Sequence, residues 1–211
     1  GTRPNTEFAI SFDLDVIKIY EDYDKCERIY FGREIINEKK AEKERRIYEL
    51  SQVKSVPEEM PYQIPFRHLC NLLQINSGSL EAVIGELKDI RESQKEKLKT
   101  RALCAWNWIT NFAPEDFRFT LKTSSDQAEA VDEISATVLR ADADQVRKLD
   151  SHTEASLSES IYAAAQDNGM DPKDLFRLIY TVLIGKEKGP RLAGFIITAG
   201  KDKILPILEK Y

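Results

Sequence analysis

Apolar residues recur at three- and four-residue spacing along most of the chain, which is the pattern of amphipathic helices. After Asp13 the first such series includes Val16, Ile19 and Tyr20, and Gly32 is placed to end the helix. Residues 34–53 continue as a second helix that is mostly charged. In that helix Ile47 and Leu50 supply only a thin apolar edge, so the pattern predicts a solvated helix with one docked stripe.

Three prolines in nine residues separate these helices from the rest of the chain. Pro57, Pro61 and Pro65 each remove an amide donor and bias the preceding residue away from helix, so this segment is the predicted domain boundary. Three short core helices are expected after it, at residues 66–73, 79–90 and 98–109.

Turn and cap residues divide the last part of the chain into further helices. Pro114 interrupts the series, and a helix through Val138 is expected to begin at Ser125 or Asp126. The later signals are a helix start at Thr153, an end at Asn168-Gly169, a start at Asp171-Pro172 and an end at Gly185. The predicted fold class is therefore all-α, a helical bundle or cage with a short mixed N-terminal segment that includes one strand at residues 7–12.

Composition describes a globular protein of one large or two small domains. The 211 residues are 42% hydrophobic and 32% charged, and no run approaches the ~20 apolar residues of a membrane-spanning helix. The chain starts without methionine in an apolar segment, as a piece of a longer protein would. We expect a cytoplasmic monomer without membrane contact.

Charge is unevenly distributed along the chain. The net charge of −5 argues against indiscriminate attraction to nucleic-acid phosphates. Residues 126–174 are predominantly acidic, whereas residues 186–203 are predominantly basic. One hypothesis from this pattern is a helical scaffold that binds other proteins through its acidic helices, without contact to nucleic acid.

Groups that could bind a metal or perform catalysis are scarce. The chain has three scattered cysteines and two histidines, so we predict no metal site and interpret the cysteines as small apolar core groups. His68, on an apolar helix, is more typical of a buried, hydrogen-bonded histidine than of a catalyst, and His152 lies at a helix start. No nucleophile with a nearby base or glycine-rich phosphate loop is present, so no catalytic residue is predicted.

Two tryptophans stand on one predicted helix, separated by Asn107. Trp106 and Trp108 project about 200° apart, so both cannot face the core. The structural interpretation places Trp106 inside and Trp108 at a helix–helix seam. The functional interpretation is a surface on which an unpaired base stacks.

The segment after Gly185 has a pattern typical of anion binding. A glycine ends one helix, a basic loop follows, and Gly189-Pro190 is expected to start the next helix, so amide groups and cations converge there. The alternative is a tight turn between helices that carries solvated lysines. Spacing alone does not separate the two.

Four segments of the chain resemble the carboxy-terminal part of class I lysyl-tRNA synthetases, which occur in archaea and some bacteria. The four segments are Arg3-Pro4-Asn5 with residues 10–15, residues 23–32, residues 64–69, and Gly185-Lys186 with Gly189-Pro190-Arg191. The last is shared in weaker form with glutamyl-tRNA synthetases. The ATP-binding motifs of the family are expected upstream, because the only partial match, residues 122–125, lies in the wrong place.

The resemblance implies a function in tRNA recognition. Residues 1–62 would form a stem-contact region, and residues 63–211 an α-helical cage that receives the anticodon end of tRNA(Lys). The full-length enzyme would ligate lysine to tRNA(Lys) with ATP, whereas this part would need no cofactor and would not be catalytic by itself. By charge and position, the candidate RNA-binding residues are Arg67, Trp106, Lys186, Lys188, Arg191, Lys201 and Lys203.

Overall fold

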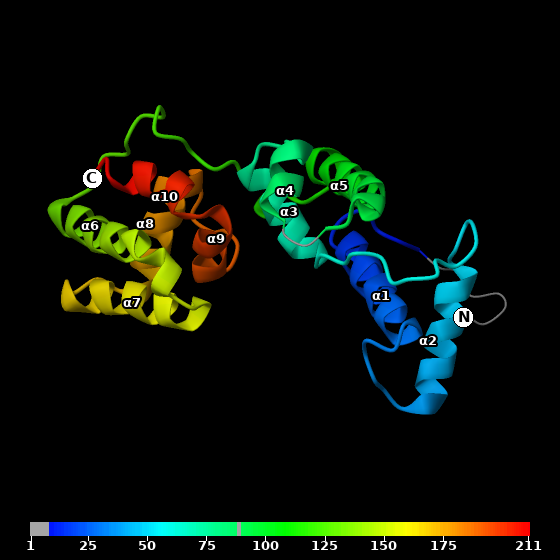
Figure 1. Ribbon diagram of the computed structural model, residues 1–211. Coiled ribbons are helices and arrows are strands. Elements are labelled where there is room, and N and C mark those ends of the chain that lie inside the picture. The colour runs from blue at the N-terminus through cyan, green and yellow to red at the C-terminus, as the bar shows by residue number, and fades with distance from the viewer. Residues whose placement is uncertain (1–8, 88–89) are drawn as a thin grey trace. The chain divides into compact units, whose positions relative to one another are not determined.

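A computed structural model describes residues 9–87 and 90–211 (Figure 1). Within these ranges the chain contains ten α-helices, two short 3-10 helices and no strand, which confirms the all-α prediction. The expected strand at residues 7–12 is wrong where it can be compared, because residues 9–12 are irregular. Glu7 and Phe8 lie outside the described residues.

The chain divides into two compact units. Unit 1 comprises Gly1–Cys70 and Leu80–Pro114, and unit 2 comprises Asn71–Ser79 and Glu115–Tyr211. The helices of unit 1 are α1 (Asp15–Tyr30), α2 (Glu38–Leu50), α4 (Leu80–Glu86), α5 (Glu92–Asn111) and the first half of α3 (Phe66–Ile75). The division at residue 62 concerns which part of the RNA each region contacts, not the compact units, and it stays a prediction.

Helices α1 and α2 pack against each other in unit 1 (Figure 1). The residues of α2 that do so are Ala41 and Tyr48, which are buried, whereas Ile47 and Leu50 are exposed. The predicted apolar edge is therefore wrong. The reason is a polar contact that the apolar pattern does not show: the Tyr48 hydroxyl donates to the buried Glu27 carboxylate at 2.9 Å.

A buried ion pair joins α1 to α5. The Arg101 guanidinium donates two hydrogen bonds, both 2.6 Å long, to the Asp24 carboxylate, and the exposed fractions of the two side chains are 15% and 5%. Arg101 also lies over the Tyr20 ring, 5.0 Å from its centroid. This bidentate pair fixes α5 to α1 in the interior of unit 1.

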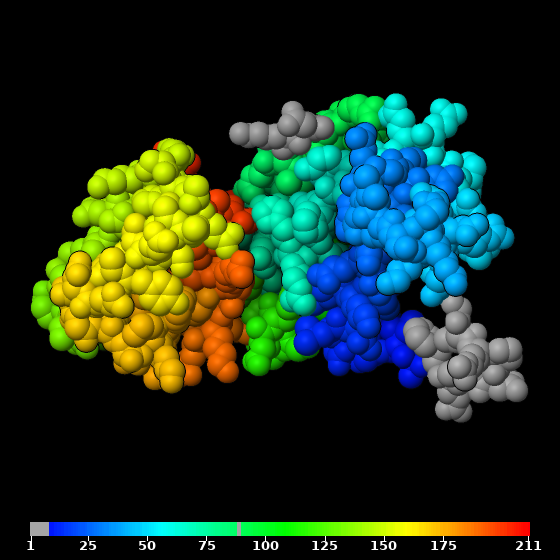
Figure 2. Space-filling view, turned by 90° about the horizontal axis from the view of Figure 1, so that it is seen from below, coloured from blue at the N-terminus to red at the C-terminus, as the bar shows by residue number. Residues whose placement is uncertain are grey.

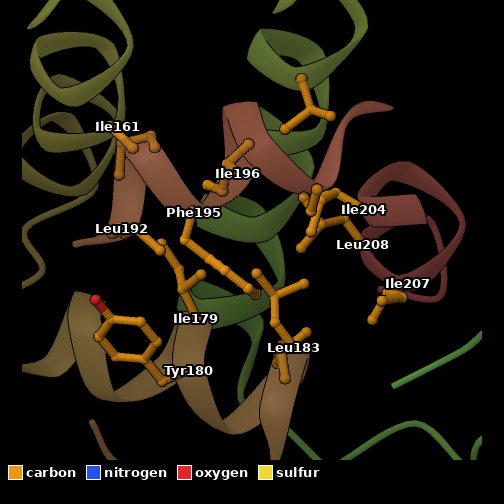
Figure 3. Close-up of a cluster of buried hydrophobic side chains, with 14 of the residues drawn as sticks. Ile161, Ile179, Tyr180, Leu183, Leu192, Phe195, Ile196, Ile204, Ile207 and Leu208 are labelled. Atoms are coloured by element: carbon orange, nitrogen blue, oxygen red, sulfur yellow. The ribbon is translucent and has the colours of Figure 1, made fainter. Parts of the chain in front are cut away.

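Unit 2 is built around one apolar core. Its elements are η1 (Glu115–Phe117), α6 (Glu133–Arg147), η2 (Leu149–Ser151), α7 (Glu154–Asp167), α8 (Pro172–Ile184), α9 (Leu192–Ala199), α10 (Lys201–Leu208) and the end of α3. Figure 3 shows Ile161 of α7, Leu183 of α8, Phe195 of α9 and Ile204 of α10 in the same cluster. Each of these four side chains is almost fully buried.

Local cap signals fixed the ends of α7 and α8 as predicted. Thr153 forms a capping box with Ser156 at the start of α7. Asp171 caps the first turn of α8 and Pro172 occupies it. Gly185 ends α8 in the left-handed conformation, with φ of 68°, which is strained for residues with a side chain.

Other predicted boundaries are wrong. Helix α6 begins at Glu133 after its cap Asp132, not at Ser125 or Asp126. The Asp126 carboxylate instead accepts hydrogen bonds from the Thr123 amide and hydroxyl, and the Lys210 ammonium donates to the carbonyls of both residues, so this segment is held as a turn. Helix α4 ends at Glu86, short of residue 90, and α5 has 20 residues rather than being short.

Candidate nucleic-acid interface

The loop between α8 and α9 is held closely against α8. Helix α9 starts at Leu192 with Arg191 as its cap residue, so the predicted start at Gly189-Pro190 is wrong by two residues. A Cβ on Gly189 would lie 2.7 Å from two carbons of the Tyr180 ring. The Tyr180 hydroxyl donates to the Pro190 carbonyl. Glycine therefore allows the loop to pass directly over this ring.

The cations of this corner are mostly paired with acidic groups. Lys186 donates to the Glu115 carbonyl at 2.7 Å and pairs with its carboxylate at 3.0 Å. The hydrogen bond that Lys186 donates to this carboxylate, together with the positive charge of Lys186, lowers the pKa of Glu115. Lys188 is exposed and has no ion pair with any residue that the structure describes. A phosphate would therefore compete with Glu115 for Lys186 but not for Lys188.

Arg191 pairs with the first residue of α7, and Lys201 pairs with η2 in the connection between α6 and α7. Arg191 lies 3.4 Å from the Glu154 carboxylate, and Lys201 lies 2.7 Å from Asp150, which raises the pKa of that lysine. Lys203 donates to the Asn76 side chain at 2.8 Å. Exposed pairs of this kind contribute little to stability, so an incoming phosphate can replace Asp150 at Lys201 at little cost.

The structure therefore distributes the predicted site residues rather than gathering all of them. Lys186, Lys188, Arg191, Lys201 and Lys203 belong to unit 2, whereas Arg67 and Trp106 belong to unit 1. Within unit 2 the partners of the cations lie in η1, in η2, at the first residue of α7 and directly after α3.

The two tryptophans have the reverse of the expected burial. Trp108 is only 4% exposed, and its indole donates to the Phe12 carbonyl at 2.8 Å. Trp106 is only partly buried, so the structural interpretation of the pair is wrong. Arg67 is exposed and lies 3.4 Å from Glu21. Trp106 and Arg67 thus both present polar or aromatic surface to solvent.

Sequence reasoning missed a cavity of about 510 Å³ in unit 2. It lies among α7, α8 and the start of α9, and its walls include Glu154, Ser158, Tyr162, Phe176 and Arg191. Glu154, Ser158 and Tyr162 are spaced four residues apart and so share one face of α7, a pattern that could have indicated a common surface. The contribution of α8 and α9 depends on tertiary packing and leaves no local pattern.

No group of three or more potential ligands that could hold a metal ion occurs among residues 9–87 and 90–211. Cys26 and Cys70 are buried as expected, and burial raises the pKa of both thiols to about 12. Cys104 is exposed, so its assignment to the core is wrong. His68 is partly buried, and desolvation lowers its pKa.

None of the helices in the described part of the chain is both long enough and apolar enough to span a membrane.

Comparison with known families gives two matches that together cover most of the chain. Residues 1–54 match the model of tRNA synthetases class I (K), and residues 109–210 match an anticodon binding domain. The second match covers most of unit 2, including the α8–α9 loop and the cavity.

Individual relatives agree with these matches. The whole chain is 46% identical to a lysine–tRNA ligase of Borreliella burgdorferi and 47% identical to one of Treponema pallidum. Over 98% of the chain it is 32% identical to a lysine–tRNA ligase of Thermococcus kodakarensis. The chain spans about two fifths of these relatives, 41%, 40% and 40% of their respective lengths.

Proposed function

We propose that this chain binds tRNA(Lys), because it belongs to the class I lysyl-tRNA synthetases and corresponds to their carboxy-terminal region with the anticodon-binding domain. The single observation that supports this most strongly is the anticodon-domain match over residues 109–210. It favours RNA binding over the alternative of an acidic protein-binding scaffold.

The two family matches also support a division of labour along the chain. Residues 1–62 contact the stem of the tRNA, and residues 63–211 form the cage that receives its anticodon end. The synthetase match ends at residue 54 and the anticodon-domain match begins at residue 109, so the proposed boundary lies between them.

The activity of the whole synthetase belongs to a longer protein of the cytoplasm. There, lysine and ATP react in a catalytic part upstream of this region, and tRNA(Lys) receives the lysine. Within this chain the contribution is to hold the RNA, and no residue of it is assigned to catalysis.

The RNA contacts are assigned to Arg67, Trp106, Lys186, Lys188, Arg191, Lys201 and Lys203. The cations are supported by their position beside weakly held acidic partners, which phosphates can replace. Trp106 and Arg67 are supported by their accessibility. Trp106 would stack on an unpaired base, a contact worth about 1–3 kcal/mol.

A titration of fluorescently labelled tRNA(Lys) at two salt concentrations tests this function. We expect the 211-residue protein to bind less tightly at higher salt, because each phosphate contact releases counterions. The triple variant K186A/K188A/R191A should bind more weakly at low salt, and its slope of log K against log salt should be smaller by about 2, given about 0.7 per contact to a single strand.

The control variant is K148A/K173A, which removes two exposed cations from the acidic segment of unit 2. Its affinity and salt slope should remain close to those of the parent. If the triple variant binds as tightly as the parent at low salt, the α8–α9 corner is a solvated turn and makes no RNA contact.

A further inference from the structure

The cavity among α7, α8 and α9 has a wall of aromatic rings. Tyr162 and Phe176 meet edge to face, with ring centroids 5.4 Å apart and an interplanar angle of 82°. Phe176 in turn lies parallel to Tyr180 at 6.4 Å. Tyr162 and Phe176 are only partly buried, so the core of unit 2 does not cover these two rings completely. The cavity thus offers flat apolar surface to a planar ligand.

The rim of the same cavity carries a hydrogen-bond donor beside an acceptor. The Glu154 carboxylate and the Arg191 guanidinium lie 3.4 Å apart, and their side chains are 48% and 88% exposed. A long contact between exposed groups is easily opened. Both groups can therefore turn from each other to a ligand in the cavity, and the Ser158 hydroxyl lies on the same face of α7 as Glu154.

Charge at the rim decides between two kinds of nucleic-acid contact. A phosphate placed beside Arg191 would also approach the Glu154 carboxylate, and like charges at this distance repel. The Glu154 carboxyl group also lies close to the backbone of α9 at this corner, since a Cβ on Gly194 would lie 3.4 Å from its carboxyl carbon. A neutral ligand with both donor and acceptor atoms fits the pair better than an anion does.

An unpaired nucleobase has these properties. It is planar, it stacks on aromatic side chains, and its Watson–Crick edge presents donor and acceptor atoms side by side. A volume of about 510 Å³ lies within the range of about 300–1,000 Å³ that is common for small-ligand sites. Helices α7 and α9, which border the cavity, lie side by side on one face of unit 2 (Figure 2, yellow and orange).

We propose that this cavity takes one unpaired base of the bound RNA, which stacks against Tyr162 and Phe176 while its Watson–Crick edge pairs with Glu154 and Arg191. This inference rests on the proposed function and adds to it a site for a base, where the basic loop alone provides contacts to phosphates. Arg191 then contacts a base rather than a phosphate, so the change in salt slope of K186A/K188A/R191A would come from two phosphate contacts and be about 1.4 instead of about 2.

The experiment measures the affinity of the 211-residue protein for the isolated anticodon stem-loop of tRNA(Lys). Three further stem-loops each carry an abasic residue at one anticodon position. One of these replacements should weaken binding to the parent protein about tenfold, in line with the strength of base–aromatic stacking. The variants E154Q, which removes the charge at constant shape, and Y162L, which removes the ring, are then titrated with the same four RNAs.

For Y162L, we expect the loss caused by that one abasic position to fall to less than about twofold, while losses at the other positions remain. For E154Q, which leaves the rings in place, the same loss should decrease only in part, because stacking persists while the pairing of the base edge is weakened. Glu159 is exposed on the same helix outside the cavity, so E159Q is the matched control and should behave as the parent. E154Q keeps the test valid if Y162L folds poorly.

Unchanged abasic losses in both E154Q and Y162L would overturn the base site and leave the proposed function intact. A parent protein that does not bind the stem-loop at all would overturn both.

Discussion

Asp142 is a buried carboxyl group in α6 with an unusual environment. It is only 2% exposed, and neither of its carboxyl oxygens has a hydrogen-bond partner in the described part of the chain. Desolvation raises its pKa from 3.8 to about 8. The folded protein therefore holds this proton more tightly than the unfolded chain between those two pH values.

The consequence is a stability that falls as pH rises. The unfolded chain releases the Asp142 proton near pH 4 and the folded protein near pH 8, so the free energy of unfolding should decrease through this window and level off above it. Between pH 5 and pH 8 the parent should lose roughly 4 kcal/mol of unfolding free energy relative to the D142N variant, which has no charge to bury. Urea unfolding at pH 5 and pH 8 measures this difference.

A control for this prediction stands two residues further along α6. Asp144 is exposed, so D144N should leave the pH dependence of the parent in place. If D142N shows the same decrease between pH 5 and pH 8 as the parent, Asp142 does not titrate in this window.

Arg101 is expected to matter more for unit 1 than any exposed ion pair. Replacing it with methionine would leave the Asp24 carboxylate buried without its guanidinium, which costs about 3–5 kcal/mol. Urea denaturation should show this loss for R101M and a much smaller change for R45M, whose pair with Glu38 is exposed. The double variant R101M/D24L should recover much of the stability. If the double variant loses as much stability as R101M, the unpaired Asp24 carboxylate is not the cause of the loss.

At the scale of elements, Gly189 sets the path of the α8–α9 loop. In G189A the new methyl group would meet the Tyr180 ring at 2.7 Å and the Ile184 side chain at 2.9 Å. We expect a loss of about 1–3 kcal/mol in unfolding free energy, because Tyr180 is too buried to retreat. The control is G85A in α4, where no atom lies within 4 Å of the added Cβ and stability should be unchanged or slightly higher. Equal stabilities for G189A and G85A would show that the loop relaxes freely.

The helices whose ends could be predicted are those with local signals. Thr153, Asp171-Pro172 and Gly185 act on their own backbone neighbours, so their effect is visible in the sequence. The start of α6 could not be located, because the turn at Asp126 also depends on Lys210, which is distant in sequence. The burial of Trp108 depends likewise on Phe12, a residue from another part of the chain.

For the candidate site, the cations could be located from the sequence but their environment could not. Residues 186–203 are visibly basic, yet Glu115, Asp150 and Glu154 reach them only through the packing of unit 2. The same packing creates the aromatic cavity. Apolar periodicity predicts which face of a helix is buried, but it does not predict which side chains of different helices meet.

At the scale of the whole molecule, each of the two units has a buried interior of its own. The bidentate Asp24–Arg101 pair lies within unit 1, and the apolar cluster of Figure 3 lies within unit 2. The two tryptophans of the chain, Trp106 and Trp108, both belong to unit 1. Tryptophan fluorescence therefore follows the unfolding of unit 1, whereas circular dichroism follows the helices of both units.

Because both tryptophans lie in unit 1, the variants R101M and D142N test whether the two units unfold independently. R101M should move the fluorescence transition in urea to lower concentration and leave the later part of the dichroism transition in place, because it weakens unit 1. D142N at pH 8 should move the dichroism transition of unit 2 to higher concentration without changing the fluorescence midpoint. Each variant is the control for the other. Fluorescence and dichroism curves that coincide in the parent, and that shift together in both variants, would show instead that the chain unfolds as one cooperative unit.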